Sequence, residues 1–130
     1  VLFRSKDAEA KIQSVLEQVR LADRADDRTV TYSRGMLQRL GIADALVKDP
    51  TVLILDEPTT AIDPIGVVEI LDMLRGLVRD RGVTILLSSH LLSQVQSVCD
   101  RVGIFAAGGV AGHFASSSIC QPRIRAIASA

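Results

Sequence analysis

The chain has 130 residues, of which 48% are hydrophobic and 23% charged, and its 15 basic residues balance its 15 acidic residues. This length is that of one domain or part of one. The neutral balance argues against electrostatic binding to nucleic acid or to anionic lipid. Cys99 and Cys120 lack metal-ligand spacing, so a reducing compartment fits better than a disulfide framework. We expect neither a signal peptide nor a membrane span, and the initial Val1 in place of Met suggests a fragment.

The first part of the chain predicts two helices. In residues 7–23 apolar side chains recur at helical spacing, with charged residues on the other face. Residues 23–31 are polar and irregular, which predicts a loop. Ser33 stands where an N-cap belongs, and the second helix should run to about Lys48, because Pro50 disfavours helical geometry at the residue before it.

A short apolar run, Val52–Leu55, lies between two prolines and leads directly into Asp56 and Glu57. A run of this kind predicts a strand buried on both faces. In open parallel sheets, ligands bind beyond the carboxyl ends of the strands. The two carboxylates therefore predict a Mg²⁺–nucleotide site, with an acidic cap of the next helix as the alternative.

Helices and strands alternate through the rest of the chain. We expect a helix over 64–82, a strand over 83–87, a short helix over 91–98 and a strand over 102–105. This order predicts a parallel sheet with helical crossovers. The last segment, 115–130, is rich in Ser and Ala and predicts a weakly ordered tail.

Several polar residues have both a structural and a functional interpretation. The helix that begins at Ser33 has free backbone N–H groups that bind anions, and Gly35 permits close approach of the backbone. Taken alone, however, Ser33 and Asp63 are more often helix caps. A lone histidine at a strand end, such as His90, is more often a structural hydrogen-bonding group than a catalyst.

Taken together, these motifs resemble the C-terminal portion of the nucleotide-binding subunit of ATP-binding cassette (ABC) transporters. The sequence Tyr32-Ser33-Arg34-Gly35-Met36 is similar to the signature motif of that family, usually LSGGQ. Residues 52–57 match the Walker B strand with its adjoining glutamate, residues 60–63 the D-loop, and Ser89-His90 the switch histidine. The resemblance covers about residues 8–105 and is greatest to exporters whose ATPase and membrane subunits are separate polypeptides.

The resemblance implies a fold and a set of domains. The fold would be α/β, an incomplete P-loop NTPase-type parallel sheet flanked by helices. Residues 1–49 would form part of the helical subdomain with the signature motif. Residues 50–114 would form part of the RecA-like core, and residues 115–130 the weakly ordered tail.

The resemblance also implies roles in ATP hydrolysis for three residues of the core. Asp56 would hold Mg²⁺ through water. Glu57 would be the general base or the residue that orients the attacking water. His90 would contact the γ-phosphate.

The remaining implied roles concern partners. Ser33 and Gly35 would bind the γ-phosphate of ATP held mainly by a second ATP-binding subunit. Asp63 would help to couple the two sites across that head-to-tail dimer. The other partner would be an integral membrane permease, which would place the protein in the cytoplasm, peripheral on the inner face of the cell membrane.

The sequence departs from the family pattern in two ways. Arg34 replaces a glycine of the signature and Met36 a glutamine. We expect Arg34 to point to solvent, with a cation near phosphate as the alternative. The chain also contains no G-x-x-x-x-G-K-[ST] phosphate loop, the Walker A motif. The family places the Walker A strand between the strands that match 83–87 and 102–105. We therefore expect a gap or unpaired strand edges, marginal stability, and no ATP hydrolysis by the chain alone.

Four functions remain open from the sequence, one of them a soluble translation-associated ABC protein, which would carry a second cassette outside these 130 residues. The leading hypothesis is a truncated ATP-binding subunit of an ABC-type export transporter. The first alternative is a non-enzymatic regulatory or interaction fragment of an ABC ATPase, which the coding sequence upstream of Val1 would test. The second is a DNA-repair or chromosome ATPase, disfavoured because residues 7–23 show no sustained heptads.

Overall fold

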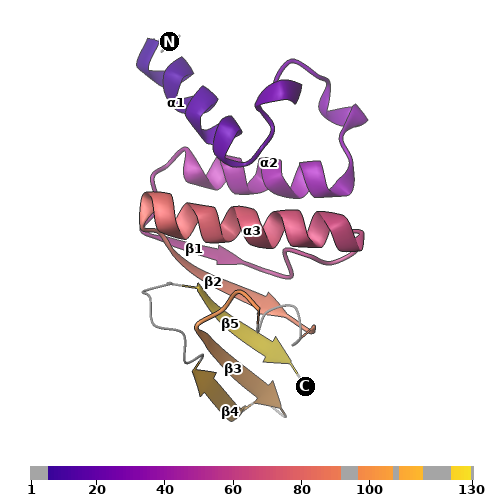
Figure 1. The fold of residues 1–130 in the computed structure, drawn as a ribbon, viewed down its shortest axis with the longest axis vertical. Helices are drawn as coiled ribbons and strands as arrows, with labels where there is room; N and C mark the ends of the chain where they lie inside the picture. Colours follow the sequence, from indigo (N-terminus) through magenta and orange to yellow (C-terminus); the bar gives the residue numbers. More distant parts are fainter. Residues whose placement is uncertain (1–5, 92–96, 107–108, 116–123, 130) are drawn as a thin grey trace. The chain divides into compact units, whose positions relative to one another are not determined.

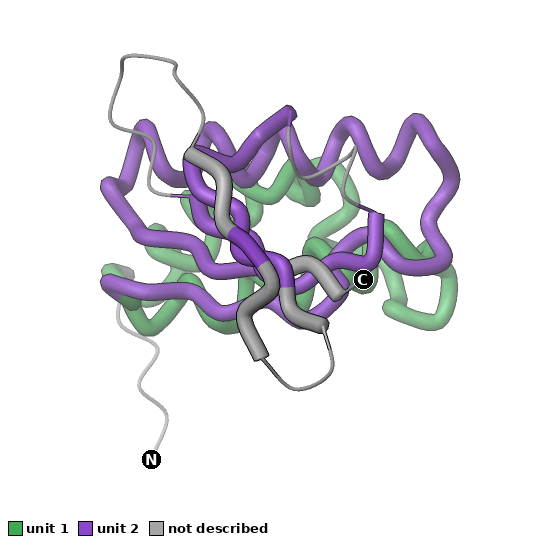
Figure 2. The backbone as a smooth tube through the Cα atoms, turned by 90° about the horizontal axis from the view of Figure 1, so that it is seen from below, with its two compact units in different colours: residues 1–50 green, residues 51–130 purple. Residues whose placement is uncertain are grey.

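The structure, a computed structural model, describes residues 6–91, 97–106, 109–115 and 124–129. The chain divides into two compact units, Val1–Pro50 and Thr51–Ala130, which Figure 2 distinguishes by colour. We describe each unit by itself. Across the described residues, every helix is too short or too polar to cross a membrane.

Unit 1 contains two α-helices in its described part, α1 (Lys6–Gln18) and α2 (Arg34–Leu46) (Figure 1). The segment between them includes two short 3-10 turns, Ala22–Arg24 and Thr29–Thr31. Ser33 is the N-cap of α2, as its sequence position predicts, and its hydroxyl accepts a hydrogen bond from the Met36 N–H at 3.3 Å.

Helix α1 ends earlier than the apolar spacing predicted. The Leu21 N–H donates to the Leu16 carbonyl at 2.8 Å, and the Arg20 N–H donates to the Glu17 carbonyl at 3.0 Å. This pair of bonds is a Schellman C-cap, and Arg20 takes the required left-handed conformation with φ 58°. Leu21 is buried beyond the cap. The prediction of a helix as far as residue 23 was therefore wrong, because an arginine fills the position that usually belongs to glycine.

Unit 2 is built around a five-stranded sheet in the order β1-β2-β5-β3-β4 (Figure 1). The elements along the chain are β1 (Val52–Leu55), α3 (Pro64–Arg81), β2 (Thr84–Ser89), β3 (Arg101–Ala106), β4 (Gly109–Ala115) and β5 (Ile124–Ser129). The pairs β1–β2, β2–β5 and β3–β5 are parallel, and β3–β4 is antiparallel. The predicted α/β class with a parallel sheet is confirmed, with β4 added as an antiparallel edge strand. The predicted helix over 91–98 falls largely on residues 92–96, which lie outside the described residues.

Local signals in the sequence determine both ends of α3. The Asp63 carboxylate accepts a hydrogen bond from the Gly66 N–H at 3.0 Å and caps the first turn, and Pro64 occupies the first helical position. At the other end, Gly82 takes the left-handed conformation with φ 67° and donates its N–H to the Val78 carbonyl at 3.0 Å. The predicted start and end of this helix are confirmed.

The core of unit 2 lies on one face of the sheet. Parallel register places buried side chains of neighbouring strands in pairs, Leu53 with Ile85 and Ile85 with Ile124. On the other face of β1, Val52 is 53% exposed and Ile54 72% exposed. The prediction that this strand is buried on both faces was therefore wrong. Strands of a parallel sheet are buried on both faces when helices cover both faces of the sheet, whereas the described part of unit 2 contains a single α-helix.

The end of the chain corrects two further expectations. Residues 124–129 form strand β5 rather than part of a weakly ordered tail, and this strand lies between β2 and β3. The expected gap at that place is therefore filled. Asp100 holds the start of β5, because its Oδ2 accepts from the Ile124 N–H at 3.1 Å and its own N–H donates to the Ile124 carbonyl at 2.9 Å. Burial of Ile124 and Ala126 adds an apolar contribution.

Candidate functional site

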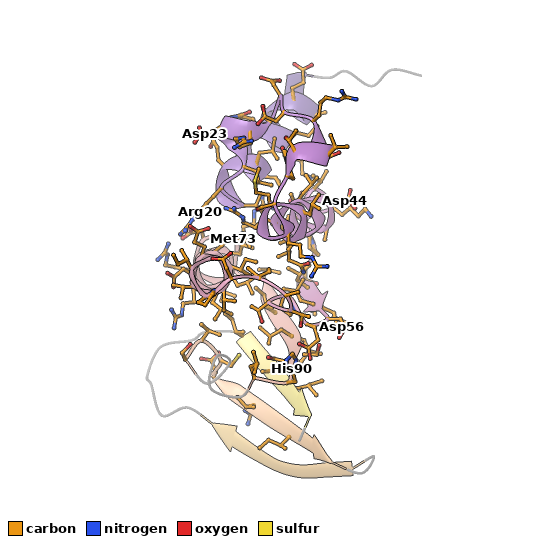
Figure 3. All side chains as sticks on the ribbon, turned by 90° about the vertical axis from the view of Figure 1, so that its right-hand side faces the viewer. Arg20, Asp23, Asp44, Asp56, Met73 and His90 are labelled. Atoms are coloured by element: carbon orange, nitrogen blue, oxygen red, sulfur yellow. The ribbon has the colours of Figure 1, made fainter. Side chains whose placement is uncertain are left out.

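Two parallel strands bring the predicted core residues to one edge of the sheet. Leu55, at the end of β1, pairs with Leu87 of β2, so the residues that follow each strand emerge side by side. Asp56 and Glu57 follow β1, and His90 follows β2. Figure 3 shows Asp56 and His90 close together at this edge. The carboxyl ends of parallel strands are the usual position of ligand sites in α/β sheets.

A serine links the two strand ends. The Ser88 hydroxyl donates a hydrogen bond to Asp56 Oδ1 at 2.6 Å and accepts one from the Glu57 N–H at 2.8 Å. A hydroxyl group can do both at once because it has one hydrogen and two lone pairs. Ser88 therefore contacts both members of the acidic pair.

The Glu57 carboxylate has two side-chain partners at the same oxygen. Thr60 Oγ1 donates to Glu57 Oε2 at 2.9 Å, and His90 Nδ1 lies 2.9 Å from that oxygen. The contact with His90 is an ion pair when the imidazole is protonated, and a hydrogen bond when a neutral ring has its hydrogen on Nδ1. The side chains of Glu57 and His90 are 33% and 53% exposed, so both remain accessible to water and to a ligand.

The backbone of Glu57 is held in an unusual conformation. Its φ is 46°, in the left-handed region that non-glycine residues seldom occupy. Its N–H donates to Ser88 Oγ at 2.8 Å, and its carbonyl accepts from the Thr60 N–H at 3.1 Å. Strained backbone of this kind occurs frequently at functional sites, where surrounding contacts impose it.

The residues at this edge fit one mode of Mg²⁺ binding. Mg²⁺ prefers oxygen ligands and usually takes one or two carboxylates, with water and substrate phosphates completing its shell. Asp56 is exposed and supplies such a carboxylate. Among the described residues, no group of three or more His, Cys, Asp or Glu side chains could hold a metal ion. In this mode of binding, phosphate and water supply most of the ligands of the cation.

The signature segment lies in unit 1, at the start of α2. Its first-turn N–H groups have no partner within the helix, which is the property that makes helix N-termini bind anions. The Ser33 hydroxyl accepts the capping bond from Met36 and keeps its own hydrogen for another acceptor. Gly35 is half-buried, and Arg34 is exposed as expected.

Three side-chain hydrogen bonds hold the start of α2 and the segment before it. The Tyr32 hydroxyl donates to the Arg24 carbonyl at 2.6 Å. The Arg39 guanidinium donates to the Arg20 carbonyl at 3.3 Å and to the Gly35 carbonyl at 3.4 Å. These bonds order the approach to α2 within unit 1.

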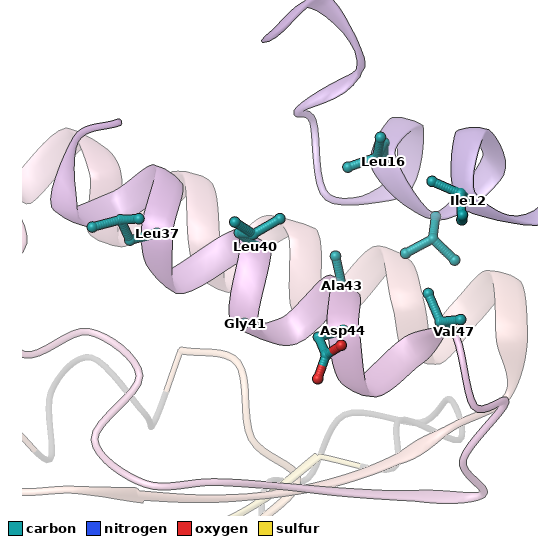
Figure 4. A pocket seen from close by; sticks show the side chains of 9 residues that line it. Ile12, Leu16, Leu37, Leu40, Gly41, Ala43, Asp44 and Val47 are labelled. Carbon is teal, nitrogen blue, oxygen red and sulfur yellow. The ribbon is translucent and has the colours of Figure 1, made fainter. Parts of the chain in front are cut away.

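Unit 1 also contains an apolar groove of about 710 Å³ between α1 and α2 (Figure 4). Asp44 is the one charged residue in its lining, and most of the others are aliphatic. The lining consists of Ile12, Val15, Leu16, Leu37, Leu40, Gly41, Ala43, Asp44 and Val47. A triphosphate needs several hydrogen-bond donors, so this groove is unsuited to a nucleotide.

The structure groups some of the predicted site residues and leaves others apart. Asp56, Glu57 and His90 form one connected set through the bonds given above. Asp63 caps α3 and is exposed. Ser33 belongs to unit 1.

Ser88 and Thr60 belong to the site but were not predicted from the sequence. The two strands that it predicted, aligned by their apolar runs, would have placed Ser88 beside Asp56. Thr60 lies three residues after Glu57 in a turn, and its contact depends on the left-handed backbone of Glu57, which the sequence does not indicate.

Comparisons with known proteins show which family the chain resembles. A family model described as ABC transporter matches residues 2–60. The uncharacterized ABC transporter ATP-binding protein YhcH of Bacillus subtilis (strain 168) is 53% identical over 75% of this chain and 32% of its own length. The Nod factor export ATP-binding protein I of Rhizobium meliloti (strain 1021) is 45% identical over 80% of this chain and 31% of its own length.

A solved structure shows the same likeness. CbiO1 of Clostridium perfringens, described as part of the ABC transporter complex cbiONQ, superposes with a TM-score of 0.79 at 33% identity. The match covers 85% of this chain and 45% of CbiO1. The chain spans about a third of the length of the curated relatives named above.

The fold of the chain is that of an ATP-binding cassette of the P-loop NTPase class. Within that class, the chain matches the C-terminal portion of ABC transporter ATP-binding subunits. The resemblance that the sequence motifs indicated is therefore confirmed.

Proposed function

We propose that the chain is the C-terminal part of the ATP-binding and ATP-hydrolysing subunit of an ABC-type export transporter. The observation that supports this proposal best is the contact of Glu57 with His90, at 2.9 Å, beside an Asp56 held by the same strand pair. A relative named for Nod factor export supports the direction of transport.

Each residue of the edge has a defined task in this proposal. Glu57 orients the water that attacks the γ-phosphate of ATP and accepts its proton, while Thr60 and His90 limit the directions of its carboxylate. His90 has a second ring nitrogen with which it contacts the γ-phosphate. Asp56 would hold Mg²⁺ through water, and that cation, when bound, neutralises charge on the phosphates.

The remaining residues act between subunits in this proposal. Ser33 and Gly35 bind the γ-phosphate of ATP held mainly by a second ATP-binding subunit, using the hydroxyl hydrogen and the first-turn N–H groups of α2. Asp63 links the two sites of the head-to-tail dimer. The other partner is an integral membrane permease, and the protein is cytoplasmic and peripheral on the inner face of the cell membrane.

ATP turnover tests the proposal in two preparations. The 130-residue chain alone should show no detectable hydrolysis, because its sequence contains no G-x-x-x-x-G-K-[ST] loop. A longer protein with the upstream coding sequence, if that sequence encodes such a loop in frame, should hydrolyse ATP. In the longer protein Glu57→Gln should keep ATP binding and lose turnover, since the amide cannot accept the proton.

Two results would contradict the proposal. Hydrolysis by the chain alone that Glu57→Gln abolishes would show that no second nucleotide-binding half is needed. Unchanged turnover of Glu57→Gln in the longer protein would refute the role of Glu57. An upstream sequence without a phosphate loop would instead favour the alternative, a non-enzymatic regulatory fragment that offers its signature helix to an intact ATPase.

A further inference from the structure

We propose that Ser88 is a positioning residue for the acidic pair: its hydroxyl fixes both the direction of the Asp56 carboxylate and the backbone of Glu57. This inference rests on the proposed function, because it assigns Ser88 a task in the same ATPase site. It adds a residue of β2 to a site whose acidic pair follows β1.

The parallel register places Ser88 where it can reach both residues. Leu55 pairs with Leu87, so the residues that follow them, Asp56 and Ser88, lie beside one another. Leu87 is buried, and Ser88 is half-buried on the opposite face of β2. Its hydroxyl donates to Asp56 Oδ1 at 2.6 Å and accepts from the Glu57 N–H at 2.8 Å.

Glu57 needs such a partner because of its backbone. With φ 46° it occupies a region that disfavours residues with a side chain, and its orientation decides where the carboxylate points. Ser88 binds the N–H on one side of the residue, and the Thr60 N–H binds the carbonyl on the other at 3.1 Å. The side chain then meets His90 at 2.9 Å.

The Ser88 hydroxyl also supports Asp56, because it donates a hydrogen bond to a carboxylate that would bind the metal and does not itself contact the metal. A hydrogen bond to one carboxylate oxygen restricts the rotation of the group and leaves lone pairs for a cation or its water. Outer partners of this kind typically change metal affinity or activity by about 10- to 100-fold when they are removed.

Hydrogen exchange tests the geometric part without a nucleotide or a metal. The chain has four glutamates, Glu9, Glu17, Glu57 and Glu69, so selective labelling of glutamate nitrogen gives few amide signals. Ser88→Ala should speed hydrogen exchange at the Glu57 amide by roughly threefold to tenfold, because the amide loses the protection that one hydrogen bond gives. Ser88→Thr should keep the slow exchange, since it retains the hydroxyl.

The other glutamates and a control variant separate positioning from general destabilisation. Glu69 lies within α3, so its amide reports on opening of unit 2 as a whole. Thr84→Val removes a hydroxyl from the start of β2 and should change neither signal. Faster exchange at both Glu57 and Glu69 in Ser88→Ala, or unchanged exchange at Glu57, would overturn the inference.

Turnover in the longer protein tests the functional part. Ser88→Ala should lower kcat by about 10- to 100-fold and leave the KM for ATP within about twofold, with rescue by Ser88→Thr. Normal kcat in Ser88→Ala, together with lost turnover in Glu57→Gln, would refute the role of Ser88 and leave the proposed function intact. Normal turnover in Glu57→Gln would refute the proposed function itself.

Discussion

Replacing Ile124 by Ala tests whether β5 completes the sheet of unit 2. Ile124 is 1% exposed and pairs with Ile85 of the neighbouring strand β2, which is fully buried, so it lies in the core of unit 2. Its N–H and carbonyl both bond Asp100, at 3.1 and 2.9 Å. Truncation of the side chain leaves these backbone bonds in place, and the variant therefore measures packing alone.

The expected cost follows from the atoms removed. Ile→Ala deletes three carbon atoms, each worth about 0.8 kcal/mol of transfer free energy when buried, or about 2.4 kcal/mol together. The cavity that remains adds to this amount, so we expect a loss of about 3 to 4 kcal/mol in the free energy of unfolding. Domains are stable by only about 5 to 15 kcal/mol, so the loss should be plain in urea unfolding followed by circular dichroism.

Ile54 provides the matched control. It is also a strand isoleucine, but its side chain is 72% exposed on β1. Ile54→Ala should lower the free energy of unfolding by less than about 1 kcal/mol. Equal effects of the two substitutions would show that 124–129 does not form a buried strand, and the reasoning would be refuted.

Two further predictions concern the start of α3 and the free thiol. Asp63→Ala should lower the free energy of unfolding by about 1 kcal/mol, because it removes the oxygen that accepts from the Gly66 N–H. Asp63→Asn should retain the cap. Chemical unfolding of both variants checks this prediction, and equal losses of stability in the two variants would contradict it. Burial, with a contribution from Asp100, raises the pKa of the Cys99 thiol from 9.0 to about 12, so the folded state keeps a proton that the unfolded state loses. The free energy of unfolding should therefore fall as pH rises from 9.0 towards 12, and Cys99→Ala should reduce that fall in urea unfolding across the range.

The elements that the sequence predicted well are those with strong local signals. Helix α3 has an acidic cap at Asp63, a proline at its first position and a glycine at its end, and each acts as expected. The carboxylates after β1 and the histidine after β2 meet because two neighbouring parallel strands end at one edge. These features depend on residues close in the sequence or on one simple rule of topology.

The features that the sequence did not predict depend on non-local pairing or on unusual backbone. Strand β5 contains alanine, a weak strand former, and it forms because β2 and β3 provide partners on both sides. The end of α1 depends on Arg20 in a conformation that glycine usually supplies. Ser88 gains its importance from a partner across the sheet and from the left-handed backbone of Glu57.

The position of β5 bears on how the chain would behave within a longer protein. In the cassettes that it resembles, the Walker A strand lies between the strands that correspond to β2 and β3, where β5 lies in this chain. One position in a sheet accepts one strand, so β5 and a Walker A strand exclude each other there. In a longer protein that binds ATP, Ile124→Ala should therefore cost less than about 1 kcal/mol, far below its cost in the chain alone. The full cost in both preparations would mean that β5 keeps the central position, and that the phosphate loop cannot lie beside Asp56 in the way the family requires.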